Sequence, residues 1–278
     1  MSAGEGKVWF VTGSSRGLGR AFVEAALSRG DRVAATARKS LAELTEQYGD
    51  AVLPLVVDVT DKAAVFQAVE QAHAHFGRLD VIVNNAGYGL TGAVEELDET
   101  NVRDQFETNF FGPLWVVQAA LPYLRAQGDG RIIQVSSVAG LTGLPLGGAY
   151  CASKCAFEGL SEALAAEAAP FGVKVTMLEP GGYATDGVTG GVRSTPNPLY
   201  DDVRAALATH LATADFGDPA AAGQAILELA DTPNPPLRIF FGTEGFPMMQ
   251  QVYAERLKTW EDWQDLSVRA MGTPGTAC

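Results

Sequence analysis

Short apolar runs alternate along this chain with longer amphipathic stretches, and no other feature of the sequence limits the fold as strongly. Most of these runs are rich in β-branched residues and nearly continuous, which is typical of strands covered on both faces. Strands and helices that alternate at this spacing predict βαβ units and a parallel sheet. The sequence therefore predicts an α/β fold with helices on both faces of a doubly wound sheet.

We expect about seven parallel strands in a single Rossmann-like domain with a C-terminal helical tail. The expected strands are Val8–Thr12, Arg32–Thr36, Val52–Val57, Val81–Asn84, Arg131–Val135, Val173–Leu178 and Leu237–Phe241. The expected helices are Gly17–Arg29, Lys62–Phe76, Glu99–Arg125, Ala149–Ala169, Pro219–Asp231 and Gly245–Val268. No linker-like stretch divides residues 1–278, within which we distinguish a loop region at 185–215 and a helical extension at 243–278. The segment Gly181–Leu199 has no clear period, and loops of such length are usually functional.

Charge and composition exclude several classes of function. The formal charge of −13 argues against a nucleic-acid partner, because binding to phosphates needs a basic surface. No apolar run approaches the roughly 18 residues of a membrane span, and the N-terminus lacks the pattern of a secretory signal. We therefore expect a cytoplasmic protein without a membrane partner. The three Cys and three His show no spacing typical of a metal site, so no metal is expected.

The stretch TGSSRGLG, Thr12–Gly19, follows the first expected strand and opens the first expected helix. Glycines at such a turn let the backbone approach a pyrophosphate, and the helix N-terminus offers free N–H groups and a partial positive charge. The spacing is G-x-x-x-G-x-G rather than the commoner G-x-G-x-x-G. A turn that only joins a strand to a helix is the alternative, but the position in the first βαβ unit favours a dinucleotide site.

The second expected strand runs into ATARK, Ala35–Lys39, where an NAD site would carry an acidic residue for the ribose 2′-OH. This chain instead has Arg38, followed by Lys39, with Arg16 in the Gly-rich loop. A guanidinium is suited to bidentate binding of a 2′-phosphate. The alternative is that Arg38 is only a solvated charge at the end of a strand. We predict NADP(H) as the cofactor and disfavour NAD(H).

Six motifs, in this order, resemble those of the short-chain dehydrogenase/reductases. They are TGSSRGLG, NNAGYG (Asn84–Gly89), ETNFFG (Glu107–Gly112), VSSVAG (Val135–Gly140), YCASK (Tyr150–Lys154) and PGGYAT (Pro180–Thr185). Within that family the chain looks most like the 17β-hydroxysteroid-dehydrogenase-like branch, judging from ATARK, NNAGYG, FGPL, YCASK and APFGVKV. The resemblance implies a carbonyl reductase or alcohol dehydrogenase, which interconverts a ketone or aldehyde and an alcohol by hydride transfer.

The resemblance also implies four catalytic residues, Asn109, Ser137, Tyr150 and Lys154. Tyr150 would be the general acid or base, although an unperturbed phenol, with a pKa near 10, is too weakly acidic. Lys154 lies one helical turn further on, where its charge would favour the phenolate and lower that pKa. Ser137 would hydrogen-bond the substrate oxygen; adjacent Ser136 is the alternative, because neighbouring residues on a strand point to opposite faces. Asn109 would hold a water that links Lys154 to solvent.

By the same resemblance, the cofactor contacts come from several stretches of the chain. They are Gly13, Ser15, Arg16, Gly17, Leu18 and Gly19 of the Gly-rich loop, Arg38, Asp58 and Val59 beside the adenine, Asn85, Ala86 and Gly87 on the adenosine side, Tyr150 and Lys154, and Pro180, Gly181 and Thr185 at the nicotinamide. An alternative role for NNAG is to end a strand and brace the central sheet.

The substrate site should be walled by Val138–Leu146, Tyr88, Tyr183 and the segment Asp186–His210. These residues are mostly apolar, with no cluster of basic side chains before Arg193. We therefore predict a small-molecule substrate that is a hydrophobic ketone, aldehyde or secondary alcohol.

The C-terminal tail departs from the family pattern. Tyr253, Leu257, Trp260 and Trp263 make one apolar stripe, which we expect to pack onto the body of the same chain. A role over the substrate pocket or against a partner subunit is the alternative. The departure puts the usual tetramer of the family in doubt, and leaves open a monomer or a homodimer through the expected helices at 99–125 and 149–169.

Two other functions use related features. A non-catalytic NADP-binding regulator or redox sensor would usually lack one of the four catalytic residues, but all four are present here. A nucleotide-sugar epimerase or dehydratase also uses Tyr-x-x-x-Lys. Such enzymes resemble a longer branch with T-G-x-x-G-x-x-G and a larger C-terminal domain, and this chain has neither.

Overall fold

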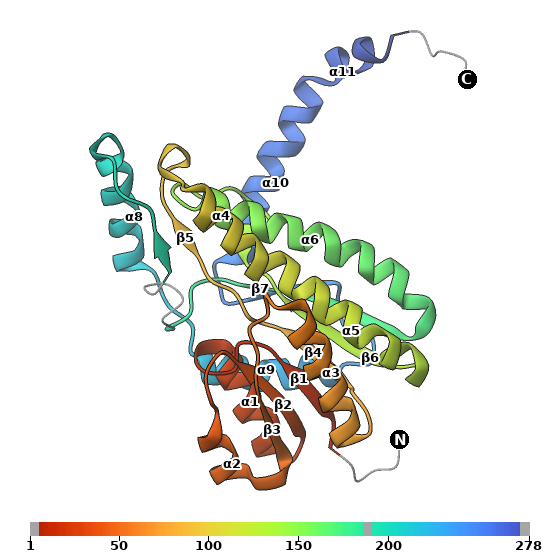
Figure 1. Cartoon of the computed structure of the whole chain (residues 1–278). Helices are drawn as coiled ribbons and strands as arrows, with labels where there is room; N and C mark the ends of the chain where they lie inside the picture. The colour runs from red at the N-terminus through yellow and green to blue at the C-terminus, as the bar shows by residue number, and fades with distance from the viewer. Residues whose placement is uncertain (1–5, 186–190, 273–278) are drawn as a thin grey trace.

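The computed structural model describes residues 6–185 and 191–272, and within them lies a seven-stranded sheet (Figure 1). Its strands are β1 (Val8–Val11), β2 (Arg32–Ala37), β3 (Val52–Val56), β4 (Val81–Asn84), β6 (Gly130–Val135), β7 (Val173–Pro180) and β9 (Arg238–Phe241). They lie in the order β3-β2-β1-β4-β6-β7-β9, and all pairs are parallel. The predicted α/β fold is confirmed. Residues 186–190 of the expected loop region and 273–278 of the expected extension lie outside the described residues.

Helices cover both faces of this sheet, because neighbouring strand residues point to opposite sides. Trp9 packs in a core with side chains of α1 (Gly17–Arg29), α2 (Ala42–Tyr48) and α9 (Pro219–Asp231). The next residue, Phe10, packs in the other core with α3 (Lys62–Phe76), α5 (Gly112–Gln127) and α6 (Gly148–Ala168). Both side chains are almost completely buried, and each such burial contributes about 2 kcal/mol to stability.

Aspartate side chains cap the N-termini of three helices. Asp61 accepts a hydrogen bond from Ala64 N at the start of α3, and Asp218 does the same for Ala220 N at the start of α9. Asp98 caps α4 (Glu99–Phe106) through two backbone N–H groups. A cap of this kind stabilises a helix by about 1 kcal/mol.

The helix expected at Glu99–Arg125 consists of three parts. A π-helical turn, η3 (Glu107–Phe111), separates α4 from α5. Single π turns inside α-helices occur frequently at functional sites. The apolar pattern on either side continues as in one long helix, so the sequence pattern did not reveal the interruption.

Several short elements were not predicted. α2 and α8 (Asp201–Thr213) are helices, and β5 (Leu90–Thr91) pairs in parallel with β8 (Val192–Arg193). The residues of α8 are almost all exposed, and the signal that could have indicated this helix is the spacing of four between Val203, Leu207 and Leu211. The remaining turns are η1 (Gly49–Ala51), η2 (Val94–Glu96), η4 (Val138–Gly140), η5 (Ala169–Phe171) and η6 (Pro198–Tyr200).

The C-terminal tail extends away from the rest of the chain (Figure 1). It consists of α10 (Gly245–Asp262) and α11 (Gln264–Met271). The four residues of the predicted apolar stripe are exposed, so the expectation that the stripe packs onto the body of the same chain is wrong. In the described part of the chain, no helix combines the length and the apolar character that crossing a membrane requires.

Candidate active site

Four neighbouring strands, β1, β4, β6 and β7, carry the predicted motifs at their carboxyl ends. Because all four strands are parallel, TGSSRGLG, NNAGYG, VSSVAG and PGGYAT meet at one edge of the sheet. The strand order changes direction between β1 and β4. Folds of this kind bind ligands at that point, outside the carboxyl ends of the strands.

The Gly-rich loop after β1 is held in place by the neighbouring strands. Ser14 N donates to Thr36 O of β2 at 2.9 Å, and Asn85 Nδ2 donates to Thr12 O at 2.9 Å. Gly13 has a φ of 70°, and a Cβ there would lie 2.9 Å from Ala86 Cα. The loop and the NNAG turn therefore pack backbone against backbone, and Asn85 braces the loop with its amide, as the alternative role for this motif requires.

The start of α1 differs from the other helix starts described above. Its N-cap residue, Arg16, makes no side-chain capping hydrogen bond, and the first turn within these described residues holds no acidic side chain. The N–H groups of this turn are therefore available to an anion. Gly17, with a φ of 59°, lies beside Thr185, whose Cγ2 would be 3.3 Å from a Cβ at that position. The first and last motifs thus meet at the start of α1.

The other predicted cofactor residues are distributed along the same edge. Arg38 is exposed just past the end of β2, and its charge acts to lower the pKa of Tyr88, although burial raises that pKa overall. Asp58 accepts hydrogen bonds from the backbone and hydroxyl of Thr60. Val59 is buried against Gly112. In the Gly-rich loop and the first turn of α1, Ser15 is exposed and Leu18 packs against the core. At the end of β7, Pro180 is buried, and Gly181 N donates a hydrogen bond to Phe241 O.

Tyr150 and Lys154 lie one turn apart at the start of α6. Lys154 Nζ is 6.0 Å from the centre of the Tyr150 ring and donates to Val135 O, at the end of β6, at 2.9 Å. Lys154 is only 5% exposed. Its ammonium group is therefore held between the catalytic helix and the sheet.

Ser137 and Ser136 have different surroundings, which distinguishes the two candidates. Ser137 acts on the Tyr150 phenol and favours a lower pKa for it. The buried Ser136 Oγ lies on the other side, where it would be 2.8 Å from a Cβ on Gly140. Of the two serines, Ser137 is the one that influences the ionisation of the tyrosine.

Asn109 lies in the π turn η3 and is completely buried. Its Oδ1 accepts from Tyr88 N at 3.0 Å, and its Nδ2 donates to Tyr88 O and to Ser153 Oγ. Gly87 lies between it and the lysine: a Cβ on Gly87 would be 3.1 Å from Asn109 Oδ1 and 3.5 Å from Lys154 Nζ. The structure thus brings the four predicted catalytic residues together around the NNAG turn.

Burial controls the ionisation of both α6 residues. Burial raises the pKa of Tyr150, while Ser137 acts to lower it. Burial lowers the pKa of Lys154 to about 8, and the charge of Glu158 opposes this change. The expectation that Lys154 lowers the pKa of Tyr150 below its ordinary value is therefore wrong for the chain alone, because desolvation outweighs the other influences.

A buried acidic cluster behind Lys154 was missed in the sequence. Glu158, one turn after Lys154, and Glu179, at the end of β7, are both almost completely buried. Arg238 Nε lies 3.3 Å from Glu158 Oε2 and 3.4 Å from Glu179 Oε1. The spacing of four between Lys154 and Glu158 was a signal that could have indicated one half of this cluster.

The residues that were expected to line the substrate site do not all lie at an open wall. Tyr183 packs its ring against Gly217 and is 8% exposed, so it belongs to the core rather than to an open wall. The helix α8 is tied to the 90–97 segment, because Glu96 accepts from Arg204 Nη1 at 2.8 Å and also from Ala93 N and Asn197 N. Residues 186–190 of the expected wall lie outside the described residues.

Leu146, in the loop before α6, has a φ of 61°. This left-handed conformation is strained for a branched side chain and tends to occur near functional sites. The side chain is buried, and the Leu146 carbonyl accepts a hydrogen bond from Gly92 N at 2.8 Å. These contacts hold the strained residue in the loop that leads into α6, four residues before Tyr150.

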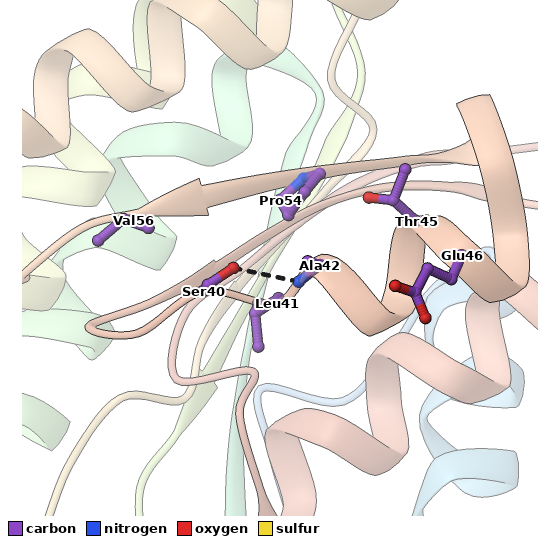
Figure 2. A pocket seen from close by; sticks show the side chains of 7 residues that line it. All are labelled: Ser40, Leu41, Ala42, Thr45, Glu46, Pro54 and Val56. Carbon is purple, nitrogen blue, oxygen red and sulfur yellow. Dashed lines mark hydrogen bonds between the residues drawn. The ribbon is translucent and has the colours of Figure 1, made fainter.

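A hollow of about 430 Å³ lies at the edge of the sheet, between α2 and β3 (Figure 2). Ser40, at its rim, accepts a hydrogen bond from Ala42 N at 3.3 Å. The lining residues are Ser40, Leu41, Ala42, Thr45, Glu46, Pro54 and Val56. None of the four predicted catalytic residues lines this hollow, so it is separate from the chemistry at α6.

The family model described as short chain dehydrogenase matches residues 7–194 of this chain. A protein from Botryotinia fuckeliana named oxidoreductase BOA17 is 41% identical over 269 residues, which cover 94% of this chain and 98% of the relative. A 3-ketodihydrosphingosine reductase from Bacteroides thetaiotaomicron is 38% identical over 259 residues, covering 91% of this chain and 93% of the relative.

Solved structures show the same similarity. A short-chain dehydrogenase from Streptomyces avermitilis has a TM-score of 0.90 and 38% identity, with 97% of this chain and 100% of that chain covered. A short chain dehydrogenase from Burkholderia cenocepacia in complex with NADP has a TM-score of 0.71 and 27% identity, with 93% of this chain and 97% of that chain covered.

Proposed function

The chain belongs to the short-chain dehydrogenase family, and we propose that it is an NADP(H)-dependent enzyme that interconverts a ketone or aldehyde and an alcohol. The observation that carries the proposal is the grouping of Tyr150 with Lys154, whose Nζ lies 6.0 Å from the centre of the phenol ring, and with Ser137, which acts to lower the pKa of that phenol. A phenol, a hydroxyl and an ammonium group at the carboxyl edge of a parallel sheet can polarise a carbonyl and move a proton to its oxygen.

In the reductive direction, Tyr150 donates its proton to the substrate oxygen. Its raised pKa keeps the phenol protonated at neutral pH, as a general acid requires. Ser137 donates a hydrogen bond to the same oxygen and stabilises the negative charge that develops there. The ammonium of Lys154 stabilises the phenolate that remains, and Asn109 would hold the water that links Lys154 to solvent, from which the phenolate regains a proton.

The residues at the start of α1 fit a dinucleotide. The uncapped helix start and the close-packed Gly13 leave backbone N–H groups for the pyrophosphate, and Thr185 lies next to Gly17. Arg38 would bind the 2′-phosphate, which favours NADP(H) over NAD(H). The NADP complex of the Burkholderia cenocepacia protein supports this choice. When bound, NADPH supplies the hydride for reduction, and NADP⁺ accepts it in the reverse direction.

We propose a hydrophobic substrate for this site. The 3-ketodihydrosphingosine reductase among the relatives supports an apolar ketone by its name. Residues 1–278 would then be one cofactor-binding unit, in which 185–215 contacts the substrate and 243–278 is an extension. We also propose that, within the family, the chain is most similar to the 17β-hydroxysteroid-dehydrogenase-like branch.

The test is oxidation of NADPH and NADH with a panel of hydrophobic ketones and aldehydes, for the wild type and Tyr150→Phe. We expect the variant to lose about 10²- to 10⁴-fold in kcat, because it lacks the proton donor, while NADPH still binds. Equal activity in both proteins would refute the mechanism. Binding of NADPH without turnover of any carbonyl would instead support the alternative of a non-catalytic regulator or redox sensor.

The cofactor assignment has its own variant. Arg38→Ala should weaken NADPH binding by about 10- to 100-fold, because it removes charge-assisted hydrogen bonds to the 2′-phosphate. Binding of NADH should not change. A wild type that prefers NADH would contradict the role of Arg38.

A further inference from the structure

The C-terminal tail exposes several large apolar side chains. On α10 the exposed fractions are 61% for Phe246, 43% for Tyr253, 59% for Leu257 and 61% for Trp260. Leu266, Val268 and Met271 continue this exposure on α11. Contiguous apolar surface of this kind usually marks an interaction site. The site chemistry proposed above does not use these residues.

The four α10 residues form a narrow strip, which we call the α10 seam: Phe246, Tyr253, Leu257 and Trp260. Phe246, Tyr253 and Trp260 are spaced by seven residues, and Leu257 follows Tyr253 by four. At about 100° per residue, the four side chains fall within about 60° of the helix circumference. A strip this narrow is typical of a contact between two helices, whereas a helix that lies on a globular core has a wider apolar face.

The side of α10 that faces the body of the chain is a different one. A groove of about 360 Å³ separates α10 from Thr142, and it is lined by Thr142, Val252, Glu255, Arg256, Thr259 and Trp260. Val252 and Thr259 lie about 110° to 130° around the helix from the centre of the seam, and Glu255 lies about 170° from it. Trp260 is the one seam residue that also lines the groove. Phe246, Tyr253 and Leu257 of the seam do not line this groove, and α10 itself extends away from the rest of the chain (Figure 1).

The charges beside the α10 seam indicate what covers it. Arg256 and Glu261 lie about 70° to either side of the seam. The Arg256 guanidinium already leans over the Tyr253 ring, at 5.5 Å. In a parallel pair of helices in register, a residue on one flank contacts the residue five positions later on the opposite flank of the partner. Arg256 would thus meet Glu261 of a second copy, and two-fold symmetry makes this contact twice.

We infer that the α10 seam is a dimerisation surface, on which α10 of one chain pairs in parallel with α10 of a second copy. The two-fold axis runs along the seam, and the two bodies lie on opposite sides of it. Gln250 lies on the same strip, between Phe246 and Tyr253. A polar residue at a seam position specifies register and orientation. This inference does not rest on the proposed reaction.

The test is sedimentation velocity over a range of protein concentrations. The wild type should show a reversible doubling of mass. Arg256→Glu and Glu261→Arg should each weaken it by about tenfold or more, because two attractive pairs become repulsive. The double variant Arg256→Glu/Glu261→Arg should restore it. Lys258→Glu is the matched control: it makes the same charge change, but Lys258 pairs with Asp262 of its own helix on the far side.

Cross-linking tests the orientation. In a background of Cys155→Ser and Cys278→Ser, Leu257→Cys and, in a separate variant, Phe246→Cys should each form a disulfide across the two-fold axis, because an antiparallel pair can bring at most one of these distant positions against its own copy. Lys258→Cys should not. Circular dichroism and NADPH binding would show that the variants remain folded.

Three results would overturn the inference. They are a wild type that stays monomeric, self-association that responds equally to Arg256→Glu and Lys258→Glu, and a dimer that does not cross-link through Leu257→Cys. If the chains associate through α4, α5 or α6 instead, self-association should respond equally to Arg256→Glu and Lys258→Glu. Binding of a monomeric wild type to neutral phosphatidylcholine vesicles would assign the α10 seam to a lipid surface instead.

Discussion

Replacement of Glu179 by Gln should stabilise the protein at neutral and alkaline pH. Glu179 is 1% exposed, and its Oε1 has no hydrogen-bond partner among the described residues. Burial, and then the charge of Glu158, raise its pKa from 4.5 to about 7, while Arg238 acts to lower it. The folded chain therefore holds a proton on Glu179 that the unfolded chain has already released.

The magnitude follows from this pKa. Each pKa unit corresponds to about 1.4 kcal/mol, so the full penalty of ionising Glu179 in the folded state is about 3 kcal/mol. Below pH 4.5 the carboxyl is protonated in both states and no penalty exists. As the pH rises from 4.5 to about 7, the unfolded state binds fewer protons than the folded state, so the free energy of unfolding falls. Above pH 7 the penalty is complete.

The assay is urea unfolding of wild type and Glu179→Gln at pH 5, 6, 7 and 8. The free energies should lie closest together at pH 5 and separate progressively toward pH 8, with the variant more stable. In a Glu158→Gln background the separation should be smaller and complete at lower pH, because removal of the Glu158 charge makes the Glu179 carboxyl easier to ionise. Curves for wild type and Glu179→Gln that stay parallel at all four pH values would refute the reasoning.

Two further predictions concern the surroundings of the site. Gly87→Ala places a methyl group 3.1 Å from Asn109 Oδ1 and 3.5 Å from Lys154 Nζ, so it should cost about 1–3 kcal/mol in urea unfolding and lower kcat. Glu96→Gln weakens the ion pair with Arg204 and the hydrogen bonds that hold the pKa of Glu96 at about 2, so trypsin should cleave within α8 faster.

Each of these predictions has a matched control. Gly89→Ala meets nothing within 4 Å and should leave stability unchanged; equal losses for the two glycine variants would contradict the proposed crowding at Gly87. Glu99→Gln removes a carboxylate from an exposed ion pair with Arg103 and should not affect cleavage in α8. If the Glu96 and Glu99 variants are cleaved alike, Glu96 does not anchor α8.

The apolar pattern of the sequence was sufficient to predict those strands and helices that bury a continuous face. The strands around Trp9 and Val81 were predicted because both of their faces are buried, which makes them continuously apolar. The helix α8 was not predicted, because its residues are almost all exposed and only three apolar residues, Val203, Leu207 and Leu211, mark one side of it. The π turn that contains Asn109 was also not predictable. A π turn has about one more residue than an α-helical turn, and the apolar pattern around it does not reveal this difference.

The candidate site depends on contacts between distant segments. Spacing along the chain indicated that Tyr150 and Lys154 share one helical face, but not how deeply each is buried. That burial, decided by the packing of α6 against the sheet, raises the pKa of Tyr150 and lowers that of Lys154. The cluster of Glu158, Glu179 and Arg238 joins α6, β7 and β9, so no local pattern contains it.

The sequence by itself determined the parallel α/β fold and the motifs at its carboxyl edge, because periodicity and turn chemistry act over a few residues. Tertiary structure alone decided the protonation of the site and the direction in which the tail points. Both depend on which surfaces lose water, and that is a property of the packed chain. The apolar stripe of α10 is visible in the sequence, but only the structure shows that the body of the same chain leaves it uncovered.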